Sequence, residues 1–210
     1  MGAKTALFTW GGVPREVLCE GLVADPGTAR RVAARALPGA ELTPAGQLPL
    51  AEVLYPGPGM VYAASFPGLD VLCCTDLASG LDPGTLPPPH LLPEPGERLY
   101  VHHMNSTVDG LMAGTWAGRE ELRLVMALLE DGAWQAGGMR DFEAPYWDGR
   151  RPPWDDADHT GPTPFHPMDL GEAFLLHDFG FVVEGAPHLP AAPLDPFRIT
   201  MCGFHVTTGS

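Results

Sequence analysis

The stretch FHPMDLGEAFLLHDFGF, residues 165–181, joins a loop rich in Pro and Asp to the most apolar helix candidate of the chain. Pro167 suits the first position of a helix, because its missing N–H would have no partner there. Gly180 can adopt the left-handed conformation that ends many helices. These signals predict a helix from about Met168 to Phe179.

A second helix is predicted upstream of this stretch. Asp25 can accept hydrogen bonds from the free N–H groups of a first turn, and Pro26 suits the first helical position. Apolar residues then recur on one stripe with the arginines outside it, and they are Ala29, Val32, Ala33, Ala36 and Leu37. Pro38 and Gly39 end the pattern. One or two further helical turns are expected over residues 50–54.

Most other segments have the composition of strands. They cover residues 3–10, 16–23, 59–66, 69–75, 98–104, 111–116, 121–129, 133–137 and 197–206. Pro-rich loops are expected over about residues 79–96 and 140–164. Because successive strands with short turns favour antiparallel pairing, we predict an α+β fold with one domain over residues 1–210. Its antiparallel or mixed sheet would be covered on one side by two main helices.

Composition narrows the range of partners and compartments. The 210 residues carry a formal net charge of −14, which disfavours binding to nucleic acid or to anionic membranes. No apolar run approaches the roughly 20 residues that cross a bilayer, and the N-terminal residues do not resemble a signal peptide. The four cysteines form no C-x-x-C motif, so reduced thiols and a cytoplasmic location are expected.

Four segments are similar to a known family. They are GAKTAL (residues 2–7), VYAASFPGLDV (61–71), FEAPYW (142–147) and PFHPMDLGE (164–172). Together they resemble an actinobacterial family that is known only as a domain of unknown function. The resemblance spans nearly the whole chain and therefore supports one domain. Its motifs are not catalytic signatures, so it implies no reaction, cofactor or substrate.

The segment His102-His103-Met104-Asn105 is the first candidate site. In a strand, His103 and Asn105 share one face and can present an imidazole and an amide to a ligand. Imidazole nitrogen and thioether sulfur also bind metals, and thioethers favour soft ions such as Cu(I). The alternative is one histidine in the core and one at the surface. Asp109 is a further polar candidate beside this strand.

The second candidate site combines the helix entry with the long loop before it. Pro167 keeps His166 out of the helix in an extended conformation, whereas His177 would lie about 16 Å further along it, so the two cannot share one metal ion. Glu143 lies near Tyr146 and Trp147, and a carboxylate beside aromatic rings can hold a raised pKa and act as acid or base. The alternative is a loop pinned to the core by its aromatic residues.

The sequence thus predicts a small cytoplasmic protein that binds a small molecule, with cofactor, metal and oligomeric state left open. The expected ligand-binding residues are Asn105, Tyr146, Trp147 and Asp109. If the protein is an enzyme, the predicted chemistry is acid–base catalysis by His166, Glu143 and His103, of a kind that suits biosynthesis. Two alternatives remain, a non-catalytic interaction module with Pro-rich loops as partner surface, and a metal-binding protein that uses histidine and methionine.

Overall fold

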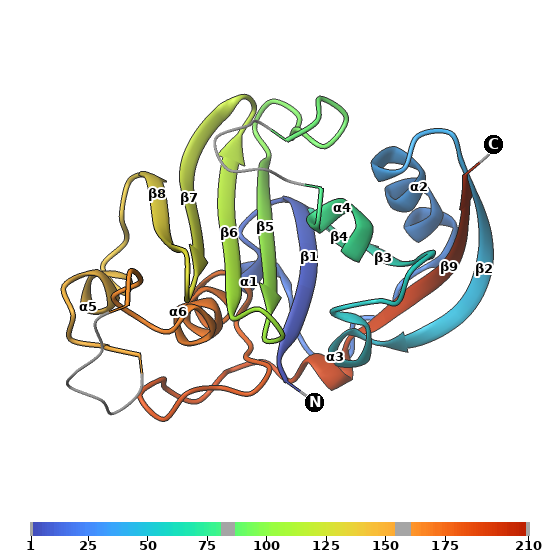
Figure 1. The fold of residues 1–210 in the computed structure, drawn as a ribbon. Coiled ribbons are helices and arrows are strands. Elements are labelled where there is room, and N and C mark those ends of the chain that lie inside the picture. Colours follow the sequence, from blue (N-terminus) through green and yellow to red (C-terminus); the bar gives the residue numbers. More distant parts are fainter. Residues whose placement is uncertain (1, 81–86, 154–160, 209–210) are drawn as a thin grey trace.

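The computed structural model describes residues 2–80, 87–153 and 161–208. Within these ranges the strands form one nine-stranded sheet in the order β2-β9-β3-β4-β1-β5-β6-β7-β8 (Figure 1). Every ladder between these strands is antiparallel. The strands are β1 Lys4–Gly11, β2 Ala40–Pro49, β3 Met60–Phe66, β4 Leu69–Cys73, β5 Arg98–Asn105, β6 Gly110–Ala117, β7 Glu120–Leu128, β8 Gly132–Gly137 and β9 Thr200–Thr208. The predicted α+β class is confirmed.

Two main helices accompany the sheet, as predicted. The helical segments are α1 Pro14–Val17, α2 Pro26–Ala36, α3 Leu50–Val53, α4 Thr75–Ala78, α5 Ala144–Trp147, α6 Pro167–Phe174, the π-helical turn η1 Leu175–Phe179 and the 3-10 turn η2 Pro196–Arg198. The predicted second main helix therefore consists of α6 and η1. Gly180 ends it with a φ angle of 82°, in the left-handed region.

Helix α2 forms for the reasons that its sequence suggests. The Asp25 carboxylate accepts a hydrogen bond of 2.9 Å from the Thr28 N–H, and Pro26 occupies the first turn. Four residues of the predicted apolar stripe, Ala29, Val32, Ala33 and Ala36, are buried, and the helix packs against β3, β4 and β9. Burial of this stripe positions the helix more strongly than propensity alone, since isolated helices of this length are marginal in water.

The two main helices lie on opposite faces of the sheet, so the prediction that one side carries both is wrong. The His102 ring contacts Gly171 of α6, whereas the Arg35 guanidinium of α2 lies 5.5 Å from the Trp10 ring centre. His102 pairs with Leu7, and side chains three residues apart in β1 point to opposite faces. The central strand β1 has six consecutive buried residues, because both of its faces are covered.

Two other segments differ from their predicted structure. Residues 16–23 do not form a strand, since Pro14 begins a helical turn and only Val23 bridges to Thr200. Strand β2 was not predicted, and its two prolines are typical of loops. As an edge strand it pairs only with β9, so prolines are tolerated there. Parts of both predicted Pro-rich loops, residues 81–86 and 154–160, lie outside the described residues.

Candidate functional site

A concave pocket of about 410 Å³ lies over β5–β8, on the face opposite to α6. Its floor is a row of neighbours on adjacent strands. In the registers of the sheet, His103 pairs with Met112, Met112 with Met126, and Met126 with Trp134. Paired residues in antiparallel strands point to the same face, so these four side chains form one row across four strands.

A second row extends the pocket toward the turns of the sheet. Asn105 pairs with Gly110, and Leu128 pairs with both Gly110 and Gly132. A Cβ on Gly110 would lie 2.9 Å from a Leu128 methyl group, so this glycine lets the Leu128 side chain pack closely against the backbone of β6. At the rim, the large exposed apolar side chains are Val108, Leu128 and Trp134. The described residues that line the pocket are therefore mostly apolar, with few polar groups among them.

His103 is the polar group on the pocket floor, and its surroundings favour the neutral ring. Burial lowers the pKa of His103, and a hydrogen bond to the backbone of Ala78 opposes this shift. The Tyr55 ring lies 6.2 Å from the imidazole, centre to centre. In a neutral imidazole that donates to a carbonyl, the second ring nitrogen is an acceptor. The site thus offers one nitrogen lone pair.

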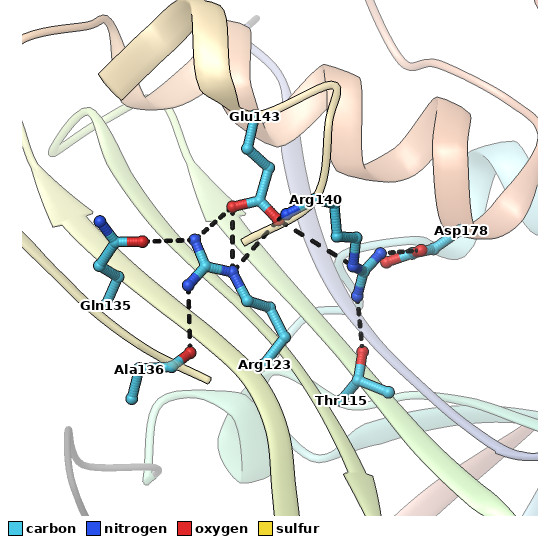
Figure 2. Close-up of polar contacts among 7 residues, drawn as sticks. All are labelled: Thr115, Arg123, Gln135, Ala136, Arg140, Glu143 and Asp178. Atoms are coloured by element: carbon cyan, nitrogen blue, oxygen red, sulfur yellow. Dashed lines mark hydrogen bonds and ion pairs between the residues drawn. The ribbon is translucent and has the colours of Figure 1, made fainter. Parts of the chain in front are cut away.

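Glu143 does not line this pocket, so the structure does not bring it together with His103. Its carboxylate is fully buried on the α6 face and pairs with Arg123, which is 2% exposed. The Arg123 Nε lies 3.1 and 3.0 Å from the two carboxylate oxygens, and Arg123 Nη2 makes a further close contact (Figure 2). A buried guanidinium requires such a counter-ion, and this pairing leaves the carboxylate no path to a ligand in the pocket.

The ion pair belongs to a larger polar cluster (Figure 2). Arg123 also donates to the Gln135 side chain and to the Ala136 carbonyl, both in β8. Next to it, Arg140 pairs with Asp178 of η1 and donates to Thr115 of β6 at 2.9 Å. Burial raises the pKa of Asp178 to about 6, and the charge of Arg140 opposes the shift. The cluster ties the long loop and η1 to the sheet.

His166 lies at the start of α6, as predicted, but outside the pocket. Its Nδ1 accepts a hydrogen bond of 3.3 Å from the Met168 N–H, and therefore caps the helix. Its Nε2 lies 3.9 Å from an oxygen of Asp109, so the structure brings these two predicted residues together. Asp109 has a φ angle of 42° in the β5–β6 turn. Neither side chain lines the pocket with His103 and Asn105.

Tyr146 and Trp147 pack into a hydrophobic cluster beneath the long loop. Both rings lie edge-on to Phe165, at 6.1 and 4.9 Å between ring centres. The Tyr146 hydroxyl lies 2.7 Å from the His188 Nε2. This is the arrangement that the alternative interpretation expects, in which aromatic residues pin the loop. Trp154, Asp155 and Asp156 of the same loop also place carboxylates beside an aromatic residue, and they lie outside the described residues.

Three residues of the pocket floor, Met112, Met126 and Trp134, were not among the predicted site residues. Their strands were predicted, but their common row depends on the registers of three ladders, which the sequence does not specify. A partial signal is present in β7, where Leu124, Met126 and Leu128 alternate with residues of the other face. Among the described residues, no group of three His, Cys, Asp or Glu side chains is placed to hold a metal ion.

Together these features define an α+β protein with one antiparallel sheet and an apolar pocket over four of its strands. The described part of the chain contains no helix long and apolar enough to cross a membrane. The chain belongs to the Family of unknown function (DUF6928), whose model matches residues 3–204. This match confirms the resemblance noted in the four sequence segments, while an actinobacterial origin stays a prediction. No curated protein and no solved structure matches the chain.

Proposed function

We propose that this protein binds a small, largely apolar and uncharged molecule in the pocket over β5–β8. The observation that carries the proposal is a volume of about 410 Å³ combined with an apolar lining and few polar groups. Sites for small molecules typically have volumes of about 300–1,000 Å³ and this kind of lining. A net charge of −14 disfavours anionic ligands further.

Each group on the floor has a distinct role in this proposal. Met112 and Met126 supply flexible apolar surface that adapts to the shape of a ligand. Trp134, a residue that is 41% exposed at the rim, can stack its ring on a planar ligand. His103 and Asn105 provide the hydrogen-bonding groups that orient it. The ligand class that fits is a planar apolar molecule with a hydrogen-bond donor.

The proposal does not include acid–base catalysis by His103, Glu143 and His166 acting together. Of the three, only His103 lines the pocket. A catalytic step at this site would therefore use the neutral imidazole of His103 as base. A cytoplasmic location is proposed as well, and the four free cysteines support it, because disulfides are rare in that compartment.

Titration with N-phenyl-1-naphthylamine tests the proposal. This neutral dye becomes fluorescent in apolar surroundings, and we expect saturable binding at one site per chain. Met126→Trp fills the pocket from a partly exposed position, so we expect the dissociation constant to rise at least tenfold. Met139→Trp is the matched control, because Met139 is 52% exposed and does not line the pocket.

The result that overturns the proposal is equal dye binding by the two tryptophan variants, or no saturable binding by the wild type. Circular dichroism of each variant confirms that the fold is retained. The exposure of Val108, Leu128 and Trp134 around the rim favours one competing function, a partner protein seated on the same surface. In that case, Leu128→Glu would abolish partner binding, and the dye would show only weak, unsaturable binding.

A further inference from the structure

We infer that the floor row His103–Met112–Met126 is a binding site for monovalent copper, with one imidazole nitrogen and two thioether sulfurs as ligands. The inference goes beyond the proposed function, because it assigns a metal ion to the floor of the same pocket. The ion would be held at the floor, and the remaining pocket volume would lie above it.

The sheet register places the three ligands at one level. His103 of β5 and Met126 of β7 flank Met112 of β6, and all three point to the same face. Adjacent strands lie about 4.8 Å apart, so the backbones of His103 and Met126 are about 10 Å apart with Met112 midway. Methionine has three rotatable bonds and adapts readily to such a site. Side chains of this length can therefore bring three donor atoms to one ion above Met112.

The donor set selects the ion. Thioether and imidazole ligands favour Cu(I), whereas Mg²⁺ and Ca²⁺ need several oxygen ligands. Among the described residues that line the pocket, the one carboxylate belongs to Asp131, which is exposed at the β7–β8 turn. Three neutral ligands suit a monovalent ion better than a divalent one, because the charge left uncompensated in an apolar pocket is smaller.

The surroundings of His103 and Met126 match this role. A histidine that binds a metal usually donates its other ring N–H to a carboxylate or a carbonyl, which fixes the orientation of the ring. His103 has this contact with the backbone of Ala78, so one ring nitrogen is left to bind the ion. Trp134 follows Met126 in the same row, where its ring face can stabilise a cation.

An anaerobic titration with Cu(I) and ascorbate, in competition with bicinchoninate, tests the site. The titration uses the Cys19→Ser background, because Cys19 is the exposed free thiol. We expect one Cu(I) per chain, and a loss of affinity of at least 100-fold in the double variant Met112→Leu/Met126→Leu. These exchanges conserve volume and apolar character. Met139→Leu, at an exposed position outside the pocket, should bind as the parent does.

Two results would overturn the copper site, failure of the parent to compete with bicinchoninate and unchanged affinity in the double leucine variant. The dye titration keeps this test separate from that of the proposed function. The parent chain is titrated separately with the dye and with Cu(I), so each kind of binding is measured on the same protein without substitutions at the pocket floor. Loss of Cu(I) affinity in the double leucine variant, with an unchanged circular dichroism spectrum, supports the copper site. If the parent chain binds Cu(I) but does not bind the dye saturably, only the small-molecule proposal is refuted.

Discussion

Replacement of Glu143 by Gln would remove the charge that balances Arg123 in the interior. The two side chains are 0% and 2% exposed, so water cannot solvate the guanidinium once the carboxylate is gone. Removal of one partner from a buried ion pair typically costs about 3–5 kcal/mol. Gln135 and Ala136 continue to accept hydrogen bonds from Arg123, and the new amide keeps one acceptor oxygen. We therefore expect the free energy of unfolding to fall by about 3 kcal/mol, near the lower end of this range.

Urea unfolding at pH 7, followed by tryptophan fluorescence, measures this loss by linear extrapolation. Domains are typically stable by about 5–15 kcal/mol, so the variant should remain folded in the absence of urea. Glu20→Gln is the control, since Glu20 pairs with Arg198 at 2.6 Å but both side chains are largely exposed. Ion pairs at the surface contribute little, and this variant should unfold as the wild type does.

The double variant Arg123→Met/Glu143→Leu separates the cost of an unpaired charge from the loss of the contact itself. Replacement of both partners by apolar residues is often neutral or stabilising, so the double variant should be more stable than Glu143→Gln. The acceptors in Gln135 and Ala136 then lose their donor, which limits the recovery. The reasoning is refuted if Glu143→Gln lies within about 1 kcal/mol of the wild type, a value typical of exposed pairs.

Two further predictions concern His102, which is buried under α6. Thr5→Val removes the hydroxyl 2.7 Å from its Nδ1 and should cost about 1–3 kcal/mol in urea unfolding, because a buried nitrogen loses its partner. Thr9→Val is the matched control, since the buried Thr9 hydroxyl has no hydrogen-bond partner among the described residues, and equal losses in the two variants would contradict the argument. Burial also lowers the pKa of His102 from 6.5 to about 3. As the pH falls, the unfolded chain therefore takes up a proton at His102 before the folded chain does. The stabilising contribution of His102 is therefore present above pH 6.5 and is lost as the pH falls toward 3, and its ring resonances in NMR should show no titration between pH 7.5 and 4.

Local signals made the helices predictable. Pro26 and Pro167 mark their first turns, and Gly180 marks the end of η1. These residues act within a few positions of themselves, so no knowledge of the fold is needed. Strand β2 has no such signal, because Pro44 and Pro49 argue against a strand. It forms because its backbone pairs with β9 at the edge of the sheet. This pairing depends on residues about 160 positions away in the chain.

The candidate site was predictable only where it depends on residues close together in the sequence. His103 and Asn105 share a face because strand residues two apart always do, and the structure places both in the pocket. Met112, Met126 and Trp134 join them only through the registers of successive ladders. The ion pair of Glu143 could not be predicted from local sequence, because its partner, Arg123, lies 20 residues earlier in the chain. An arginine between apolar residues of β7 is itself a signal, since a buried charge requires a counter-ion.

The two faces of β7 divide stability from binding. Arg123 points toward α6 and anchors the long loop through Glu143, whereas Met126 points into the pocket. Ionic and packing effects couple strongly only between residues that touch or share partners. We therefore expect Glu143→Gln to lower the free energy of unfolding without changing the dissociation constant of the dye. Met126→Trp should weaken dye binding with a smaller change in stability, because Met126 is partly exposed. If Glu143→Gln alters dye affinity while the protein is fully folded, the two faces are coupled through the backbone of β7, and the buried ion pair also shapes the pocket.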